Sequence, residues 1–264
     1  MTFSAFRSTA LVAATLLATT AFAQTAAPAE EATSPLTFNL SLTSNYKFRG
    51  QDQDQSKTRI IKPALQGGVD YAFSNGFYLG NWNSTINWTR YLPSGNNSRV
   101  EVDLYGGYKF KAGPVDLDIG ALTYLYPSSS GANTTELYFG GAFGPVSAKY
   151  ARTVSDGYFG VGKEYLIGEG KGTNYFTVAL AQEIAPNTTF KASLGFTDFT
   201  SAANAAGLPD YTDYSFGASY DFGGGLALAG AFVGANKKPS YFFAIDPSKS
   251  INQNVFLVTL TKSL

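Results

Sequence analysis

Hydrophobic and polar side chains alternate along the segment LTFNLSLTSNYKF, residues 36–48. With the exception of Ser44, every second position is apolar, and a polar residue stands between each pair of apolar ones. A period of two is typical of a β-strand whose two faces have different surroundings. The run exceeds the usual soluble strand of about 5–6 residues, and a tilted strand needs roughly 9–11 residues to cross a bilayer. The pattern therefore predicts a membrane-spanning strand with lipid on one face and a polar interior on the other.

The rest of the chain consists of similar segments joined by two kinds of connection. Five connections are short: Asn75-Gly76, Lys111 to Pro114, Gly144-Pro145, Ala185 to Thr189 and Gly223 to Gly225. Six are longer and polar or glycine-rich: residues 49–58, 92–97, 127–135, 152–173, 200–210 and 236–250. Because short and long connections alternate, they predict an all-β fold, a transmembrane antiparallel up-and-down β-barrel of about twelve strands. It would have short periplasmic turns and longer extracellular loops; fourteen strands is the alternative, because YFGVGKEYLI within 152–173 resembles another strand.

Two of the short turns allow a register to be predicted. Asn-Gly favours a two-residue type I′ turn, which would pair Phe73 with Tyr78 and Val69 with Trp82 on the lipid face. Across the next turn, the same reasoning pairs Phe110 with Val115 and Leu104 with Ala121, and places Lys109 opposite Asp116.

Aromatic residues gather beside the short turns, where an interfacial girdle would lie. They are Tyr71, Phe73, Phe77, Tyr78, Tyr108, Phe110, Phe143, Tyr220 and Phe222. The final segment, VFLVTLTKSL, places Phe256, Val258 and Leu260 on one face, with Lys262 near the interface. Such a terminal strand is expected to be recognised by the barrel-assembly machinery, although it ends in Leu264 and not in an aromatic residue.

The N-terminus has the pattern of a secretory signal. Residues 1–23 contain one basic residue, Arg7, an apolar run from Ala10 to Ala18 and a small-x-small site that predicts cleavage after Ala23. Residues 24–35 have the composition of a flexible periplasmic linker, so the barrel is expected to cover residues 36–264.

Charge and composition exclude several classes of function. Removal of Arg7 leaves 18 basic against 19 acidic residues, which argues against nucleic-acid binding. The chain has no histidine and no cysteine, which removes serine–histidine hydrolysis and ordinary zinc sites. GYFGVGKE, residues 157–164, departs from a phosphate-binding loop at Glu164, and no helix pattern follows it. We therefore expect no enzyme activity, no cofactor and no metal.

One polar strand face supplies the candidate lumen residues. The residues expected to line the lumen and set selectivity are Arg99, Glu101, Asp103, Lys109, Asp116 and Asp118. Further charges on polar faces are Lys47, Lys62, Asp70, Lys191, Asp213 and Asp221. Two readings remain open: a wet, weakly selective pore, or an internal salt-bridge network that fills a narrow barrel. Glu101 and Asp103 as glycosidase carboxylates are a much weaker reading, because two neighbours on one strand face are expected in any lumen wall.

The first long loop is a candidate constriction. It carries Arg49, Asp52, Asp54 and Lys57, and its length and charge would suit a segment that folds into the lumen. Calcium binding is disfavoured, because two carboxylates fall short of the six to eight oxygen ligands that Ca²⁺ takes. A solvated extracellular loop is the other reading.

Several segments resemble the TorF-type porin family. They are residues 42–82, EVDLYGGYKF at 101–110, YLYP at 124–127 and TELYFGGAFGPVSAKY at 135–150. The resemblance implies an outer-membrane barrel of Gram-negative bacteria with a channel role, and it supplies neither a substrate nor catalytic residues.

Together, these observations predict a porin for passive diffusion of small hydrophilic solutes or ions across the outer membrane. Its partners would be outer-membrane lipid and lipopolysaccharide, and the sequence leaves a homo-oligomer open. A non-conducting structural or adhesive barrel, which binds partners through its extracellular loops, is the second hypothesis. A soluble periplasmic β-sandwich is the third.

Overall fold

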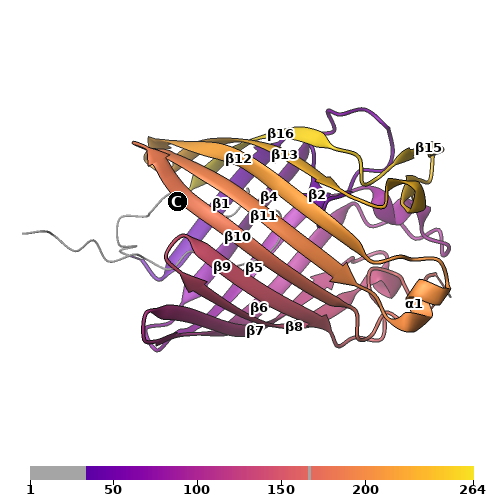
Figure 1. Cartoon of the computed structure of the whole chain (residues 1–264), viewed down its shortest axis with the longest axis horizontal. Coiled ribbons are helices and arrows are strands. Elements are labelled where there is room, and N and C mark those ends of the chain that lie inside the picture. Colours follow the sequence, from indigo (N-terminus) through magenta and orange to yellow (C-terminus); the bar gives the residue numbers. More distant parts are fainter. Residues whose placement is uncertain (1–33, 166–167) are drawn as a thin grey trace, which may run out of the picture.

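The fold was taken from a computed structural model that describes residues 34–165 and 168–264; the predicted signal peptide and nearly all of the predicted linker lie outside these ranges. Within them, twelve strands close into an antiparallel barrel (Figure 1). The strands are β1 (Leu36–Thr43), β4 (Ala64–Ala72), β5 (Phe77–Thr85), β6 (Val100–Ala112), β7 (Val115–Leu125), β8 (Thr134–Phe143), β9 (Val146–Thr153), β10 (Asn174–Ala185), β11 (Thr188–Asp198), β12 (Tyr211–Gly223), β13 (Leu226–Ala235) and β16 (Val255–Ser263).

The strands follow one another around the barrel, and β1 closes it by pairing with both β4 and β16. The predicted twelve-stranded barrel is therefore confirmed, and the fourteen-stranded alternative is wrong. The segment that suggested extra strands forms only the isolated bridges Tyr158–Val161 and Val161–Tyr165 among its described residues. It cannot add a strand because β9 and β10 already pair directly with each other.

The outward face of the barrel is apolar. Leu40, Leu42, Leu104 and Ile119 are each about half exposed, as expected of side chains that would contact lipid. Phe256, Val258 and Leu260 of the last strand also point outward, as predicted. Of the aromatic residues predicted beside the short turns, all except Tyr78 are exposed at that end of the barrel.

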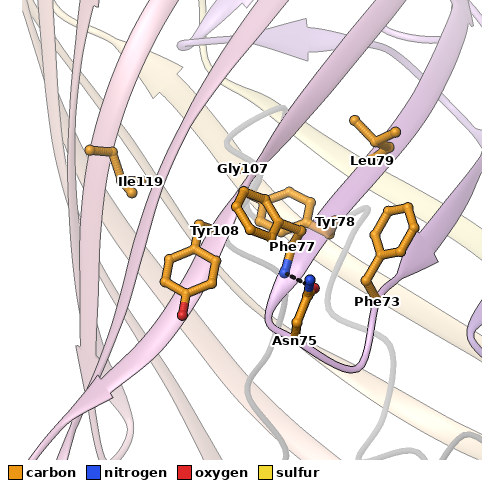
Figure 2. Close-up of a pocket in the computed structure, with 8 residues that line it drawn as sticks. All are labelled: Phe73, Asn75, Phe77, Tyr78, Leu79, Gly107, Tyr108 and Ile119. Atoms are coloured by element: carbon orange, nitrogen blue, oxygen red, sulfur yellow. Dashed lines mark hydrogen bonds between the residues drawn. The ribbon is translucent and has the colours of Figure 1, made fainter.

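The register predicted across the first short turn is wrong. Tyr71 pairs with Leu79 and Ala72 with Tyr78, so the loop has an odd number of residues. Phe73 and Phe77 flank a tight turn (Figure 2). In this turn the Gly76 N–H donates to the carbonyl of Phe73, and Gly76 has φ +93°. A left-handed glycine that adds one residue to the turn shifts the pairing by one, which reverses the faces of the following strand.

As a result, β5 turns its large aromatic residues inward. Tyr78 and Trp82 are buried inside the barrel, whereas Asn81 and Asn83 face outward. Asn83 donates to Asn81 Oδ1 at 2.6 Å and Asn81 donates to the Asp103 carbonyl at 3.0 Å, so hydrogen bonds satisfy polar groups on the lipid side.

The second predicted register has the right parity but is displaced by two residues. Phe110 pairs with Leu117, and Leu104 with Thr123, because the connection is the two-residue turn Gly113-Pro114. Lys109 therefore lies opposite Asp118, not Asp116. Faces are unchanged, since a shift of two preserves the alternation.

The long connections gather at one end of the barrel, on the right in Figure 1. They carry short elements: β2 (Lys47–Phe48), β3 (Gln51–Asp52), η1 (Trp88–Tyr91), η2 (Ser130–Ala132), α1 (Ser201–Ala205), η3 (Lys238–Ser240), β14 (Phe242–Phe243) and β15 (Asp246–Ser250). No helix in residues 34–165 and 168–264 is long and apolar enough to cross a membrane.

Glycines make room for tyrosines along the inner wall. Tyr78 lies directly across from Gly107, and a Cβ on Gly107 would stand 2.6 Å from the Tyr78 hydroxyl. Tyr105 covers Gly80 and Tyr138 covers Gly120 in the same way. Each large ring therefore lies along the wall, over a neighbouring strand that has no side chain at that position.

Candidate functional site

The connection between β1 and β4, residues 44–63 and here called loop 1, folds into the long-loop end of the barrel. Gly50 packs against β13 and β12, two and three strands from β1 in the barrel order, where a Cβ at this position would lie 2.7 Å from the Gly234 carbonyl and 2.8 Å from Asp213 Cβ. Arg49 and Gly50 both have positive φ, +46° and +74°, which allows the sharp bend at the tip. Loop 1 therefore bends into the interior.

Arg49 is the side chain that joins loop 1 to the wall. Its guanidinium makes a bidentate ion pair with Glu136 of β8, at 3.0 and 2.7 Å, and donates to the Tyr158 hydroxyl at 3.1 Å. It also lies 4.0 Å from the centre of the Tyr175 ring of β10. Burial disfavours the charged guanidinium, but Glu136 outweighs this and raises the pKa of Arg49 above its ordinary value. Arg49 is thus a fixed cation inside the barrel.

Two lysines anchor the remainder of loop 1. The Lys47 ammonium donates to the carbonyls of Gly50, Ile251 and Gln253 at 2.9, 2.8 and 2.7 Å. Burial lowers the pKa of Lys47 to about 7. Lys62 forms a fully buried ion pair with Asp52, whose pKa is raised by burial even though Lys62 opposes that shift.

A second connection, residues 154–173 and here called loop 4, enters the same space. Phe159 packs edge-on against Phe48 of loop 1 and Tyr124 of β7, with ring centroids 5.3 and 4.9 Å apart. Tyr158 of loop 4 contacts the Phe199 ring edge-on, with the ring centroids 5.5 Å apart. The long-loop half of the barrel is therefore filled by loops 1 and 4 and by aromatic wall residues.

Three carboxylates are buried on the wall beside these loops. Glu101 accepts hydrogen bonds from the hydroxyls of Tyr46 and Tyr126 at 2.7 and 2.6 Å. Glu136 is held by Arg49, as described above. Asp103 is only 1% exposed, and neither of its carboxylate oxygens has a hydrogen-bond partner.

Asp213 of β12 is a fourth inward carboxylate at this end. Its Oδ1 accepts from the Tyr175 hydroxyl at 3.2 Å, and its Oδ2 has no partner. Tyr175 is also the ring on which Arg49 stacks, so Asp213 lies on the far side of the same cluster.

A separate polar group lies nearer the short turns. The Tyr78 hydroxyl donates to Asp118 at 2.7 Å and contacts the Tyr138 hydroxyl. Lys109 lies 4.7 Å from the centre of the Tyr78 ring, and Lys149 lies 3.9 Å from that of Tyr138. Cation–π contacts of this kind hold the ammonium groups of Lys109 and Lys149 against the aromatic rings of the wall.

The structure brings some predicted lumen residues together and separates others. Glu101 and Asp103 lie in the buried cluster near loop 1, and Lys109 and Asp118 lie in the group nearer the turns. Asp116, close to a short turn, forms an ion pair with Lys111 at 2.8 Å. Arg99 is exposed before the start of β6, where it donates to Asn87.

The predicted constriction residues also divide. Arg49 and Asp52 are buried in the interior, whereas Lys57 is exposed. Asp54 is partly buried and accepts hydrogen bonds from the backbone N–H of Ser56 and the side chain of Asn87.

Sequence reasoning missed Glu136, the partner of Arg49. A signal was present: in TELYFGG, Leu137 and Phe139 alternate with Glu136 and Tyr138, so a carboxylate stands on the polar face of a strand. Its pairing with Arg49, 87 positions earlier in the chain, depends on the fold alone.

No group of three or more carboxylates in residues 34–165 and 168–264 is arranged to hold a metal ion. The acidic residues of the interior are therefore spread along the wall and do not form a chelating site.

A family model, described as a bacterial protein of unknown function (Gcw_chp), matches residues 29–264. The chain belongs to the Gcw_chp family. No curated protein matches this Gcw_chp chain in sequence.

Solved porin structures resemble the Gcw_chp barrel. The KdgM porin, alone or in complex with disordered oligogalacturonate, is 11% identical, and the match covers 87% of this chain and 98% of that one with a TM-score of 0.50. The NanC porin is 11% identical over 86% of this chain and 97% of that one, with a TM-score of 0.49. The likeness to the KdgM porin shows a shared fold: a closed, porin-like β-barrel.

Proposed function

We propose that this Gcw_chp protein is a porin-like channel of the bacterial outer membrane for passive diffusion of small hydrophilic solutes or ions. The observation that carries the proposal is the contrast between an apolar outer face and an interior lined with tyrosines and charged residues. A signal peptide cleaved after Ala23, assembly through β16 and the resemblance to TorF-type porins fit this proposal. Lipopolysaccharide and outer-membrane lipid would surround the barrel. The proposal is compatible with a monomer and with a homo-oligomer.

Loop 1 would act as the constriction. Its contacts with β8, β10, β12 and the connection 236–254 cross the interior, so solutes would pass only when the loop moves or leaves gaps. Lys109, Asp118 and Lys149 would line the part of the path nearer the periplasm. Arg99 would lie at the outer mouth and Asp116 at the inner one.

The packed interior favours one competing function, a non-conducting barrel. Glu101, Glu136 and Trp82 are each no more than 2% exposed, so this half of the barrel leaves them almost no contact with water. Such a barrel would act through its long loops, for example through the β14–β15 hairpin, which carries the exposed residues Phe242 and Ile245.

Single-channel recording of the mature protein in planar bilayers separates the two functions. We expect small conductance steps that scale with salt, and larger steps after deletion of residues 51–57, which shortens loop 1 directly after its tip at Arg49 and Gly50. Deletion of residues 244–248, around the tip of the β14–β15 hairpin, is the control and should leave conductance unchanged. If both the intact chain and the 51–57 deletion fold, shown by heat-modifiable gel migration, but stay silent, the non-conducting function is favoured.

A further inference from the structure

Four carboxylates lie on the inner wall in the long-loop half of the barrel. Counted from the short-turn ends of their strands, Glu136 is seven residues from Phe143, Asp103 nine from Ala112, Asp213 ten from Gly223 and Glu101 eleven from Ala112. Strands of a barrel share one tilt, so these counts place the four residues in one band of the wall, with Glu136 nearest the short turns and Glu101 farthest from them. We call these four residues the acidic ring.

The acidic ring spans half of the circumference of the interior, from β6 through β8 to β12. In the order of the strands, β6 and β12 are six places apart in a ring of twelve described strands, so Asp103 and Asp213 occupy opposite walls. Glu136 on β8 lies between them, two strands from β6. A solute that passed along the axis would therefore meet carboxylates from several directions.

Two members of the acidic ring have carboxylate oxygens that accept no hydrogen bond. Both oxygens of Asp103 and Oδ2 of Asp213 are buried without a hydrogen bond. A buried carboxylate oxygen is costly unless a cation or a donor satisfies it. These oxygens thus mark places where a mobile cation or its water would be stabilised.

Arg49 already shows what the acidic ring accepts. Its guanidinium lies between Glu136 and the Tyr175 ring, and it also interacts electrostatically with Asp213. This cation is delivered by loop 1 and not by the barrel wall. Four carboxylates against one guanidinium leave a formal excess of three negative charges.

Other charges offset only part of this excess. Lys62 is paired with Asp52 inside loop 1, and Lys47 is held by three carbonyls. Lys109, Lys149 and Lys191 each stand three residues from a short turn. Of these three, Lys149 interacts electrostatically with Glu136, which reduces the formal excess from three negative charges to two.

We propose that the acidic ring makes this channel cation-selective and that Arg49 is a tethered cation occupying the position through which small monovalent or guanidinium-like cations pass. This inference rests on the proposed channel function. Loop 1 then restricts flow in two ways, by filling space and by holding a competing charge in the selectivity region.

Reversal potentials in a KCl gradient across a planar bilayer test the inference. Arg49→Gln should raise conductance and move the reversal potential toward that of K⁺, because the competing charge is gone. Adding Asp103→Asn or Asp213→Asn to this variant should move it back, whereas adding Asp221→Asn, on β12 but two residues from its turn, should not. Arg49→Gln removes the cation that pairs with the buried Glu136 carboxylate, which destabilises the fold. The double variant R49Q/E136Q removes both charges of this pair, so the same substitutions are also tested in that background.

Each outcome bears on a separate claim. Conducting variants that prefer Cl⁻, or whose reversal potential does not respond to Asp103 and Asp213, would overturn the cation inference and leave the channel standing. Folded variants that are all silent would overturn the channel, and the inference with it. Block of the K⁺ current of R49Q by millimolar guanidinium, weakened in R49Q/D103N, would support the idea that Arg49 mimics the permeant cation.

Discussion

At the scale of single residues, a few side chains of loop 1 hold this loop inside the barrel. Arg49 bends into the interior with a positive φ, pairs with Glu136 and stacks on Tyr175. Lys47 ties the base of the same loop to the carbonyls of Ile251 and Gln253. Because these contacts are buried, removing one partner would leave the other polar group with neither its protein partner nor a water molecule to bond to.

Lys47 should give the fold a characteristic pH dependence. Its pKa is about 7 in the folded protein against an ordinary value of 10.5, so between these pH values the unfolded chain binds more protons. The free energy of unfolding should therefore increase as the pH rises from about 7 to 10.5, by at most about 1.4 kcal/mol per pH unit. Lowering the pH toward 7 should remove this gain.

Urea unfolding in detergent micelles between pH 7 and 9.5 measures this effect. Lys47→Met, which cannot titrate, should flatten the dependence over this range. An equally steep rise in the Met variant would assign the effect to another group.

At the scale of elements, strand faces are set by turns as much as by patterning. The turn after β4 contains one residue more than Asn-Gly alone requires, and this residue turns Tyr78 and Trp82 inward. The inward aromatics fit because glycines lie across from them. Pairing of a large ring with a bare backbone thus links the high glycine content to the packing of the inner wall.

Gly80→Ala should destabilise the barrel by about 1–3 kcal/mol, because the new Cβ would collide with the Tyr105 ring. Gly140→Ala, also in a strand and facing inward, is the matched control, since its Cβ would meet no atom closer than 3.3 Å. Equilibrium unfolding of both variants gives the comparison. Equal losses would show that backbone freedom, and not the ring, explains the glycine.

At the scale of the whole molecule, the outer surface decides where the protein resides. Leucines, valines and phenylalanines cover it from the short turns toward the long loops, and aromatics concentrate at the turn end. A soluble β-sandwich would bury such a face against a second sheet. Here the sheet closes on itself, so the apolar face has only a bilayer to cover it.

A charge placed on this face should be penalised according to its depth. Leu104→Arg, near the middle of β6, should cost about 2–4 kcal/mol, whereas Leu226→Arg, beside a short turn, should cost about 0–1 kcal/mol. Folding into lipid vesicles, followed by heat-modifiable migration, measures both. Similar costs at the two positions would argue against the membrane orientation proposed above.

The sequence by itself determined the class of fold and which connections are long and share one end, and it favoured twelve strands while leaving fourteen open. These properties follow from the alternation of side chains and the spacing of turns, which are local in the chain. Glu101, Asp103, Lys109 and Asp118 could also be placed on the inner face, because parity along one strand is local too.

Tertiary structure alone decided the choice between twelve and fourteen strands, the register at Asn75-Gly76, the partners of Arg49 and the arrangement of the acidic ring. A single added turn residue reverses a strand without altering its composition, so alternation cannot detect it. Glu136 and Asp213 meet Arg49 only because the barrel closes and loop 1 folds back into it. Contacts between residues so distant in the chain depend on how twelve strands share one interior, which no local pattern encodes.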